Sequence, residues 1–317
     1  MTDELDRARA GDTRALARLI SLVENDSPLL REVATALAPY SGTAQVVGMT
    51  GSPGVGKSTS TSALVAALRK DGKRVGVLAV DPSSPFSGGA LLGDRVRMQD
   101  HATDDGVFIR SMASRGHLGG LSAAVPQALR VLDAAGCDIV LVETVGVGQA
   151  EVEIASLADT TAVLLAPGMG DGIQAAKAGI LEIADIFVVN KADRDGADQV
   201  ARDLRYMQSL GGRHSEPGAW RPPIVKTVAI RAEGLDDLLA ALAKHRDWLT
   251  RSGEFGRRRH ARASAEIEAI AVGEVRARFA EVHGSAVLSR SAQRVIDGEL
   301  DPYTAADDLV ASLTATA

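Results

Sequence analysis

The sequence predicts an α/β protein with a doubly wound, mostly parallel sheet, preceded by N-terminal helices and followed by a C-terminal helical extension. Three observations lead to this fold class. Short apolar runs alternate with helical segments between about residues 45 and 248, as strands and helices alternate around a parallel sheet. Most of these runs are apolar throughout, which is typical of strands covered on both faces. Beyond Gly253 the strand pattern stops and apolar residues recur at helical spacing.

Residues 1–42 have the pattern of short helices. Their apolar stripes are interrupted near Gly11 and Asp12, and a further helix from Leu29 to Leu37 ends at the segment Pro39 to Gly42. We therefore expect residues 1–42 to form an N-terminal helical segment. Its apolar positions include Leu5, Ala8, Leu16, Leu19 and Ile20.

Residues 43–252 carry the alternating pattern and form the expected central domain. The polar segment 211–223 is rich in glycine and proline and is expected to be a surface loop. The predicted strands are Gln45–Met49, Val75–Val80, Val107–Met112, Asp138–Val142, Thr161–Ala166, Ile186–Val189 and Ile224–Ala229. The predicted helices between them are Ser60–Leu68, Ser122–Ala135, Ile173–Ile183, Gly196–Leu210 and Leu235–Leu249.

Residues 253–317 form the expected C-terminal arm. Its first helix carries apolar residues three or four positions apart, which therefore share one face. Two more helices are expected over Ala286–Ile296 and Tyr303–Leu313. Such a tail cannot bury its apolar face alone, and its periodicity leaves packing on the central domain and a subunit interface equally open. The residues of this face are Ile267, Ala271, Val275, Phe279 and Val282.

The composition argues against several classes of protein. A net charge of −6 argues against a generally basic surface for nucleic acid. We interpret the local cluster Arg257-Arg258-Arg259 with Arg262 as a solvated helix face. The single cysteine, Cys137, excludes an intrachain disulfide, and its place before an apolar strand suggests a small buried residue. No apolar run resembles a signal peptide or a membrane span, so we expect a cytoplasmic protein with no membrane partner.

Gly51–Ser58 matches the phosphate-binding pattern G-x-x-x-x-G-K-[ST] at every fixed position. A predicted strand precedes this segment and a predicted helix follows it, which is the context that the motif requires. The glycines let backbone N–H groups surround phosphate oxygens, and the helix N-terminus adds its positive end. Lys57 is expected to neutralise the β- and γ-phosphates and Ser58 to bind Mg²⁺. The alternative is a glycine-rich turn without a ligand.

The segment Asn190–Asp193 fits N-K-x-D and directly follows a predicted strand. Guanine presents two adjacent donors, N1–H and the 2-amino group, and one carboxylate can accept from both. Adenine lacks this pair, so the Asp193 carboxylate would discriminate against it. Asn190 is expected to hold the loop, and the Lys191 stem is expected to cover the base. The alternative reading is a polar helix cap.

Glu143 ends the predicted strand Asp138–Val142 and is followed three residues later by Gly146. This arrangement is typical of a phosphate-sensing segment, in which Glu143 acts on Mg²⁺ directly or through water and the Gly146 N–H contacts the γ-phosphate. In Ras-like GTPases a glutamine follows that glycine and orients the attacking water. Val147 stands there instead, and Gln149 is two residues further on. We therefore predict slow intrinsic hydrolysis that a partner or a loop movement accelerates.

Two further carboxylates fall in the segment where a switch is expected. Asp81 ends the strand Val75–Val80, and the carboxyl ends of strands border the ligand crevice of an open α/β sheet. Asp94 lies in Gly93–Met98, where a helix cap is almost as good an interpretation. The glycine-rich segment Pro167–Gly172 is either a second switch or an ordinary loop.

Taken together, these motifs resemble the MeaB/ArgK-type GTPases of the metallochaperone branch of P-loop GTPases. The resemblance extends from the N-terminal helices to Asp301-Pro302-Tyr303 and covers most of the chain. Its most specific part is Glu143–Gln149, with a valine after the glycine. In the segment 167–178, Met169, Gly172 and Ala178 replace the more usual residue types, whereas Lys177 is retained.

The resemblance implies a GTPase chaperone for an adenosylcobalamin-dependent acyl-CoA mutase, typically methylmalonyl-CoA mutase. Members couple GTP binding and hydrolysis to cofactor delivery and protect the mutase, and they form homodimers through their C-terminal helices. The implied ligands are GTP or GDP and Mg²⁺. The implied Mg²⁺ and switch residues are Ser58, Asp81, Asp94 and Glu143, with Lys57 and Gly146 completing the catalytic set. The implied nucleotide contacts are Gly51, Pro53, Gly54, Val55, Gly56, Lys57, Ser58, Thr59, Asn190, Lys191, Asp193 and Ala229.

Four alternative functions compete with this interpretation. Metal-insertion chaperones of the same branch need clustered thiolates or imidazoles, and this chain has one Cys and six scattered His. Dimer-sandwich ATPases carry an extra lysine early in the phosphate loop, where Ser52 stands here. A kinase acting on an amino-acid transport protein would need an acceptor site that the sequence does not reveal. A GTP-binding protein without catalysis is compatible with Val147.

Overall fold

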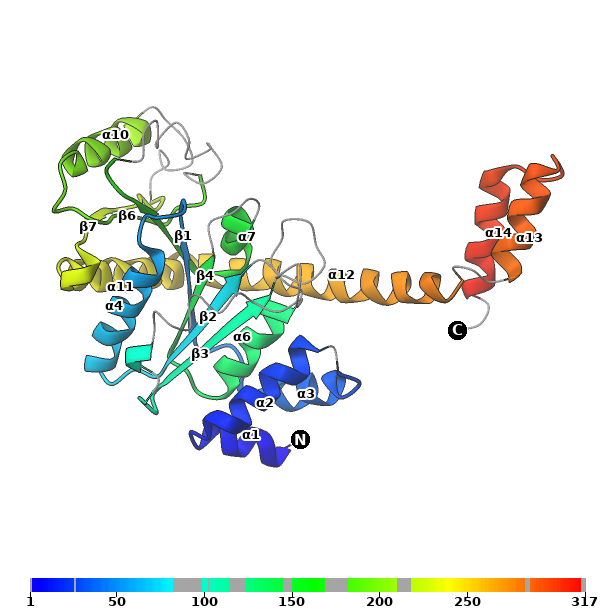
Figure 1. The fold of residues 1–317 in the computed structure, drawn as a ribbon, viewed down its shortest axis with the longest axis horizontal. Coiled ribbons are helices and arrows are strands. Elements are labelled where there is room, and N and C mark those ends of the chain that lie inside the picture. Colours follow the sequence, from blue (N-terminus) through cyan, green and yellow to red (C-terminus); the bar gives the residue numbers. More distant parts are fainter. Residues whose placement is uncertain are drawn as a thin grey trace. The chain divides into compact units, whose positions relative to one another are not determined.

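The computed structural model describes residues 2–25, 27–81, 99–101, 103–113, 124–144, 150–168, 182–209, 218–282 and 286–314 (Figure 1). The chain divides into two compact units, Met1–Arg259 and His260–Ala317. The first contains the N-terminal helices together with the sheet. No helix in the described part of the chain is long and apolar enough to cross a membrane.

The described strands form a seven-stranded sheet in the order β3-β2-β4-β1-β5-β6-β7, and every neighbouring pair is parallel. The predicted α/β class is thus confirmed. β1 lies at the centre, and the chain order diverges on its two sides, which is where ligands bind in such sheets. The strands are β1 (Gln45–Thr50), β2 (Val75–Asp81), β3 (Val107–Ala113), β4 (Ile139–Thr144), β5 (Thr160–Leu165), β6 (Ile186–Val189) and β7 (Ile224–Lys226).

One strand ends earlier than the sequence predicts. We expected a strand over Ile224–Ala229, but β7 stops at Lys226 and is followed by the 3₁₀ turn η3 (Ala229–Arg231). Val228 and Glu233 pair across this turn, and Ala232 adopts a left-handed conformation with φ of 56°. The backbone therefore reverses here, because its hydrogen bonds close a turn rather than extend the sheet.

Helices cover both faces of the sheet, because side chains alternate between the faces along each strand. One apolar cluster joins α2, α3, α6 and α7 to residues such as Val46 and Val140, and a second joins α4 and α11 to Val47 and Leu141. A third places α10 on β5 and β6. These helices are α2 (Thr13–Glu24), α3 (Leu30–Leu37), α4 (Lys57–Lys70), α6 (Ala124–Ala134), α7 (Ala150–Leu157), α10 (Ala197–Ser209) and α11 (Leu235–Ser252).

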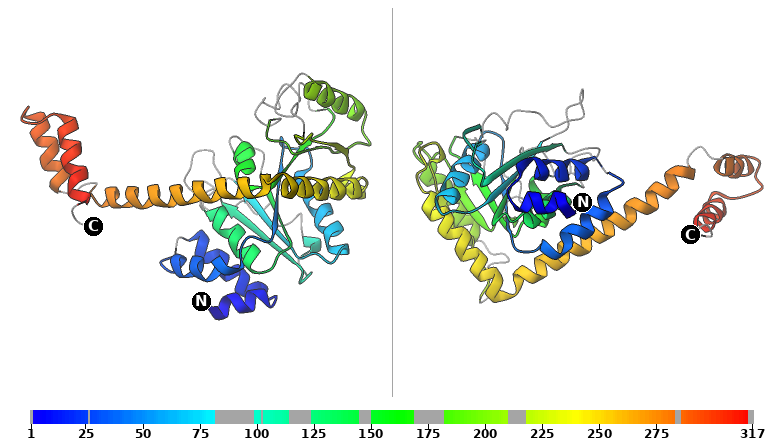
Figure 2. Two further views of the ribbon diagram at one scale, coloured as in Figure 1. Left: turned by 180° about the vertical axis from the view of Figure 1, so that it is seen from behind. Right: turned by 90° about the horizontal axis from the view of Figure 1, so that it is seen from below.

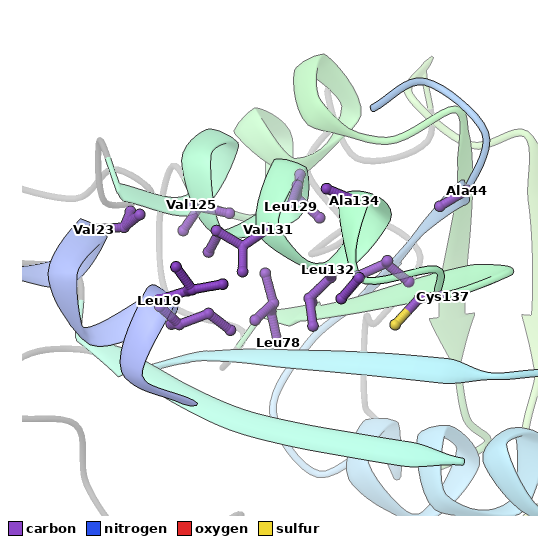
Figure 3. Close-up of a cluster of buried hydrophobic side chains, with 14 of the residues drawn as sticks. Leu19, Val23, Ala44, Leu78, Val125, Leu129, Val131, Leu132, Ala134 and Cys137 are labelled. Atoms are coloured by element: carbon purple, nitrogen blue, oxygen red, sulfur yellow. The ribbon is translucent and has the colours of Figure 1, made fainter. Parts of the chain in front are cut away.

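The predicted N-terminal helices are α1 (Thr2–Arg9), α2 and α3. The predicted break between the first two is confirmed, since Gly11 has a φ of 100° and the Asp12 carboxylate accepts from the backbone N–H groups of Arg14 and Ala15. Leu19 and Val23 of α2 pack with α6 and β2 (Figure 3). The N-terminal segment is therefore part of the main hydrophobic core.

Cys137 belongs to the same cluster and is 5% exposed (Figure 3). Burial raises the pKa of its thiol to about 12. The prediction of a small buried residue is confirmed by this low exposure.

The C-terminal extension consists of α12 (Glu254–Val282), α13 (Ala286–Ile296) and α14 (Pro302–Thr314). α12 runs without a break through its whole length (Figure 2). In this single chain, Ile267 and Val275 of its predicted apolar face are 68% and 53% exposed.

Two arginines hold the start of α12 at the amino-terminal edge of the sheet. Arg258 donates to both carboxylate oxygens of Asp185 at 2.9 Å, and Arg259 donates to Asp159 Oδ2 at 3.1 Å. Asp159 and Asp185, which directly precede β5 and β6, are both buried. The interpretation of the basic cluster as a solvated helix face is therefore wrong for Arg258 and Arg259, because they neutralise buried carboxylates. Arg257, at 78% side-chain exposure, does face solvent.

His245 of α11 is fully buried beside these ion pairs. Its Nδ1 lies 2.8 Å from Thr160 Oγ1 and its Nε2 lies 3.3 Å from Asp185 Oδ1. The rings of Trp220 and Trp248 pack against it, with centroids 4.7 and 5.7 Å away. Burial, aided by the Arg258 charge and opposed by Asp185, lowers the pKa of His245 to about 4.

Candidate nucleotide-binding site

The predicted phosphate loop lies between β1 and α4, at the carboxyl end of the central strand. Gly51, Gly54 and Gly56 have φ of 140°, 80° and 96°, which L side chains rarely adopt. A Cβ on Gly51 would meet the Leu164 carbonyl oxygen at 2.3 Å, and one on Gly56 would meet Asn190 Nδ2 at 2.5 Å. The glycines are therefore required by backbone conformation and by close approach of neighbouring groups.

Lys57 is the first residue of α4, and its side chain folds over the loop. Its Nζ donates to the carbonyl oxygens of Gly51 at 2.7 Å and Ser52 at 3.2 Å. The ammonium group thus lies at the loop backbone, within the segment expected to hold phosphates. Of the other predicted contacts, Val55 is buried in the loop, whereas Pro53 and Thr59 are exposed.

Ser58 and Glu143 meet at the carboxyl edge of the sheet. Ser58 Oγ donates to Glu143 Oε1 at 2.6 Å, and the Glu143 residue is only 2% exposed. The register pairs Glu143 of β4 with Met49 of β1, one residue before the end of that strand. The register of β1 and β4, with α4 directly after the phosphate loop, therefore brings together two of the four side chains that the sequence predicted for one Mg²⁺ site.

Asn190 connects three loops that are distant in the sequence. Its Nδ2 donates to the Val55 carbonyl oxygen at 2.9 Å, in the phosphate loop. Its Oδ1 accepts from the backbone N–H of Ala229 at 3.1 Å and from Thr227 Oγ1 at 3.2 Å, beyond β7. Asn190 itself is 3% exposed at the end of β6. One buried amide thus sets the spacing between the phosphate loop and the N-K-x-D loop.

The remaining N-K-x-D side chains also contact neighbouring loops. Lys191 has a φ of 55°, and its Nζ donates to the Gly54 carbonyl oxygen at 2.7 Å. Asp193 is 39% exposed and pairs with Arg231 Nη2 at 3.3 Å. The predicted phosphate and base loops are therefore in direct contact, with the Asp193 carboxylate at their solvent side.

The remaining predicted Mg²⁺ and switch residues are described only by their backbone or lie outside the described residues. Asp81 ends β2 and pairs in register with Ala113, so its backbone lies at the carboxyl edge of the sheet. Asp94 and Gly146 lie outside the described residues, as do Val147, Gln149 and the segment 169–181. In the part of the chain that is described, no group of three or more His, Cys, Asp or Glu side chains could hold a metal ion.

Sequence reasoning missed Thr227 and Arg231, although it included Ala229. Both residues follow β7, whose carboxyl end borders the same edge of the sheet as that of β6. That β7 pairs with β6 was the missing information, because a sequence does not state strand order. Thr227 was missed because the sequence pattern placed it inside a strand over Ile224–Ala229, whereas β7 ends at Lys226.

The seven-stranded parallel sheet, the loop Gly51–Ser58 and the base loop that Asn190 holds to it define a P-loop nucleotide-binding domain. The family model "Methylmalonyl Co-A mutase-associated GTPase MeaB" matches residues 16–283. This chain belongs to the MeaB family of GTPases.

Relatives that are named GTPases agree with this assignment, and one solved structure has a similar fold. A Pyrococcus abyssi protein named "Putative GTPase" is 49% identical over 97% of this chain and 95% of its own length. GTPase ArgK of Escherichia coli is 39% identical over 80% of this chain and 78% of its own length. The crystal structure of an LAO/AO transport system kinase superposes with a TM-score of 0.70, at 28% identity, covering 98% of this chain and 97% of that one.

Proposed function

We propose that this protein binds GTP and Mg²⁺ at the Gly51–Ser58 site, hydrolyses GTP slowly, and is stimulated by an adenosylcobalamin-dependent acyl-CoA mutase. The observation that carries the nucleotide part is the buried Asn190 amide, which joins the phosphate loop to the N-K-x-D loop. A polar helix cap would not need this link. A site that must hold a base and phosphates at a fixed separation does.

Guanine selection is assigned to Asp193. Its carboxylate can accept from guanine N1–H and from the 2-amino group, whereas adenine would leave it without these donors. Lys191 is held at Gly54 through its Nζ, which places its aliphatic stem between the phosphate loop and the base loop. Ala229, whose N–H donates to Asn190 Oδ1, is proposed as a further contact to the base.

The phosphates are assigned to the loop N–H groups from Gly51 to Thr59 and to Lys57. Lys57 exchanges its bonds to the loop carbonyls of Gly51 and Ser52 for bonds to the β- and γ-phosphates. Both partners are strong acceptors, so the ammonium group remains satisfied throughout.

The Mg²⁺ is assigned to Ser58, with Glu143 binding it directly or through water. Hydroxyl and carboxylate oxygens are ligands that Mg²⁺ prefers, and the two atoms lie 2.6 Å apart, so this chain fits the ion. When bound, Mg²⁺ neutralises charge on the β- and γ-phosphates. Asp81 and Asp94 are proposed to complete the network, and Gly146 is proposed to contact the γ-phosphate.

The mutase role rests on membership of a family described as mutase-associated. We propose methylmalonyl-CoA mutase as the partner, with GTP hydrolysis gating cofactor loading and protecting that enzyme in the cytoplasm. We further propose a homodimer formed by α12–α14, since the exposed apolar residues of α12 need a cover. We also propose three functional parts, namely the N-terminal helical segment 1–42, the GTPase domain 43–252 and the C-terminal arm 253–317.

Kinase activity is the second candidate function, because the superposed crystal structure carries that name. It requires phosphate to be transferred to a protein side chain, whereas a GTPase releases it to water. A metal-insertion role remains disfavoured by the single cysteine.

The experiment is steady-state phosphate release from GTP by the purified protein, alone and with the mutase of the same organism. We expect slow turnover that rises severalfold with mutase. Lys57→Ala is the control for contaminating activity. Turnover that is indifferent to the mutase would contradict the partner assignment, and labelled phosphate retained on protein would favour the kinase.

A further inference from the structure

Arg231 contacts the proposed guanine-reading carboxylate and a second acidic side chain. Its Nη2 lies 3.3 Å from Asp193 Oδ2, and its Nε lies 3.1 Å from Glu233 Oε1. Because different nitrogens of one planar guanidinium contact the two carboxylates, the orientation of Arg231 relative to both is defined. Neither Arg231 nor Glu233 belongs to the N-K-x-D motif.

The turn after β7 sets the position of this arginine. The Arg231 N–H donates to the Val228 carbonyl oxygen at 2.9 Å, and Val228 and Glu233 exchange backbone hydrogen bonds. The N–H of Ala229, two residues before Arg231, donates to Asn190 Oδ1. The same turn that holds the base loop through Asn190 therefore also presents the guanidinium to Asp193.

This ion pair adds little to folding stability. Arg231, Asp193 and Glu233 have side-chain exposures of 52%, 39% and 58%, and exposed pairs contribute little because water and salt screen them. Its consequence is conformational. It restricts the rotamer of a carboxylate that otherwise sits at the solvent side of the site.

The hydrogen-bonding capacity of Asp193 allows arginine and base to bind together. An ionised carboxylate has about four lone-pair sites on its two oxygens. Guanine uses one on each oxygen, and the arginine uses a further one on Oδ2. Arg231 therefore does not have to leave when the base enters.

We propose that Arg231, itself oriented by Glu233, is a positioning residue that holds the Asp193 carboxylate in the plane in which it accepts from both guanine donors. This inference rests on the proposed guanine site at Asp193. Arg231 would therefore determine the preference for guanine over bases without the 2-amino group, and not only the affinity for nucleotide. A carboxylate that rotates freely can still accept one hydrogen bond, but it loses the paired geometry that the 2-amino group needs.

The test compares GDP with IDP, which lacks the 2-amino group, by calorimetric binding to the full chain. For Arg231→Ala we expect GDP affinity to fall about tenfold and IDP affinity much less, so that the GDP/IDP ratio shrinks; tenfold corresponds to about 1.4 kcal/mol. Arg231→Lys keeps one charge without the two-carboxylate contact and should give an intermediate ratio. Glu233→Gln should shift the ratio in the same direction by a smaller factor.

Arg221→Ala is the matched control. Arg221 is exposed and lies before β7, whereas Arg231 follows that strand. Removing Arg221 therefore changes the net charge by the same amount without altering the turn that contacts Asp193. An unchanged GDP/IDP ratio in Arg231→Ala, or tighter GDP binding, would overturn the inference, the latter making Arg231 a competitor of the base. Asp193→Ala distinguishes a failure of this inference from a failure of the proposed guanine site. If it leaves GDP binding intact, the proposed guanine site itself is wrong.

Discussion

At the scale of single residues, the site depends on positions that only one type of residue can occupy without strain or a lost hydrogen bond. Gly56 has a positive φ and also lies against the Asn190 amide, so this position couples the phosphate loop to the base loop sterically. Asn190 couples them by hydrogen bonds. A buried amide that loses one partner leaves a desolvated polar group, which costs about 1–3 kcal/mol.

Gly51 and Gly54 provide a matched pair of substitutions. Both have positive φ, but a Cβ on Gly51 would meet the Leu164 carbonyl oxygen at 2.3 Å, whereas nothing lies within 4 Å of one on Gly54. We expect Gly54→Ala to cost about 1–2 kcal/mol of unfolding free energy from backbone strain alone. Gly51→Ala should cost clearly more, since β5 must also shift. Urea unfolding without nucleotide measures both, and equal losses would refute the steric argument.

At the scale of elements, α11 and the start of α12 are joined to the strands that carry the base loop. β6 has four residues and connects Asp185, which Arg258 neutralises, to Asn190 at its other end. A short buried strand thus has an ion pair at its amino end and the candidate site at its carboxyl end.

Arg257 and Arg258 are adjacent and both contact Glu254, but Arg258 also pairs with the buried Asp185. Arg258 neutralises the buried Asp185, and removing it leaves that carboxylate without its main counter-charge. We expect Arg258→Met to cost about 3 kcal/mol of unfolding free energy. Arg257→Met removes the contact of a solvent-exposed guanidinium with Glu254, which keeps its pair with Arg258, and should cost about 0–1 kcal/mol. Denaturant midpoints with unchanged slope give the comparison. Similar losses of unfolding free energy in both variants would disprove that Arg258 stabilises the fold by neutralising Asp185.

We expect the buried His245 to make the stability of the folded protein sensitive to acid. Its pKa is lowered from 6.5 in the unfolded chain to about 4 in the folded protein. Between these values the unfolded state binds more protons, so stability falls as pH decreases from about 6.5 toward 4, by at most about 1.4 kcal/mol per pH unit. The charged groups that act on its pKa are Asp185, Arg258 and Asp159, and Thr160 Oγ1 lies 2.8 Å from its Nδ1.

The check is urea unfolding at several pH values for the natural chain and for His245→Gln. The glutamine keeps a polar partner for Thr160 but does not titrate, so the slope between pH 6.5 and 4 should flatten while stability at neutral pH falls. An identical slope in the variant would show that other groups dominate acid unfolding. Fluorescence of Trp220 and Trp248, which pack on His245, reports the transition.

At the scale of the whole molecule, the sequence predicted the fold class and the strands, apart from the end of β7, because apolar runs are local patterns. The roles of the site residues stay a prediction, although the glycine loop and the N-K-x-D loop do meet at one edge of the sheet. The sequence did not predict that Arg258 and Arg259 turn inward, since their partners Asp159 and Asp185 lie about 75 to 100 residues away in the chain. Arg231 was missed for a similar reason. Its contact with Asp193 depends on β7 lying beside β6, and strand order is not a local property.

The central claim is that Asp193 selects guanine at a hydrolytic P-loop site. The most direct measurement is phosphate release from GTP, ATP and XTP by the natural chain and by Asp193→Asn. Xanthine presents N1–H as a donor and O2 as an acceptor, so an asparagine amide can match it as aspartate matches guanine. We predict strong preference for GTP in the natural chain and transfer of that preference to XTP in the variant. Equal use of GTP and ATP, or a preference that the substitution leaves unchanged, would contradict the account.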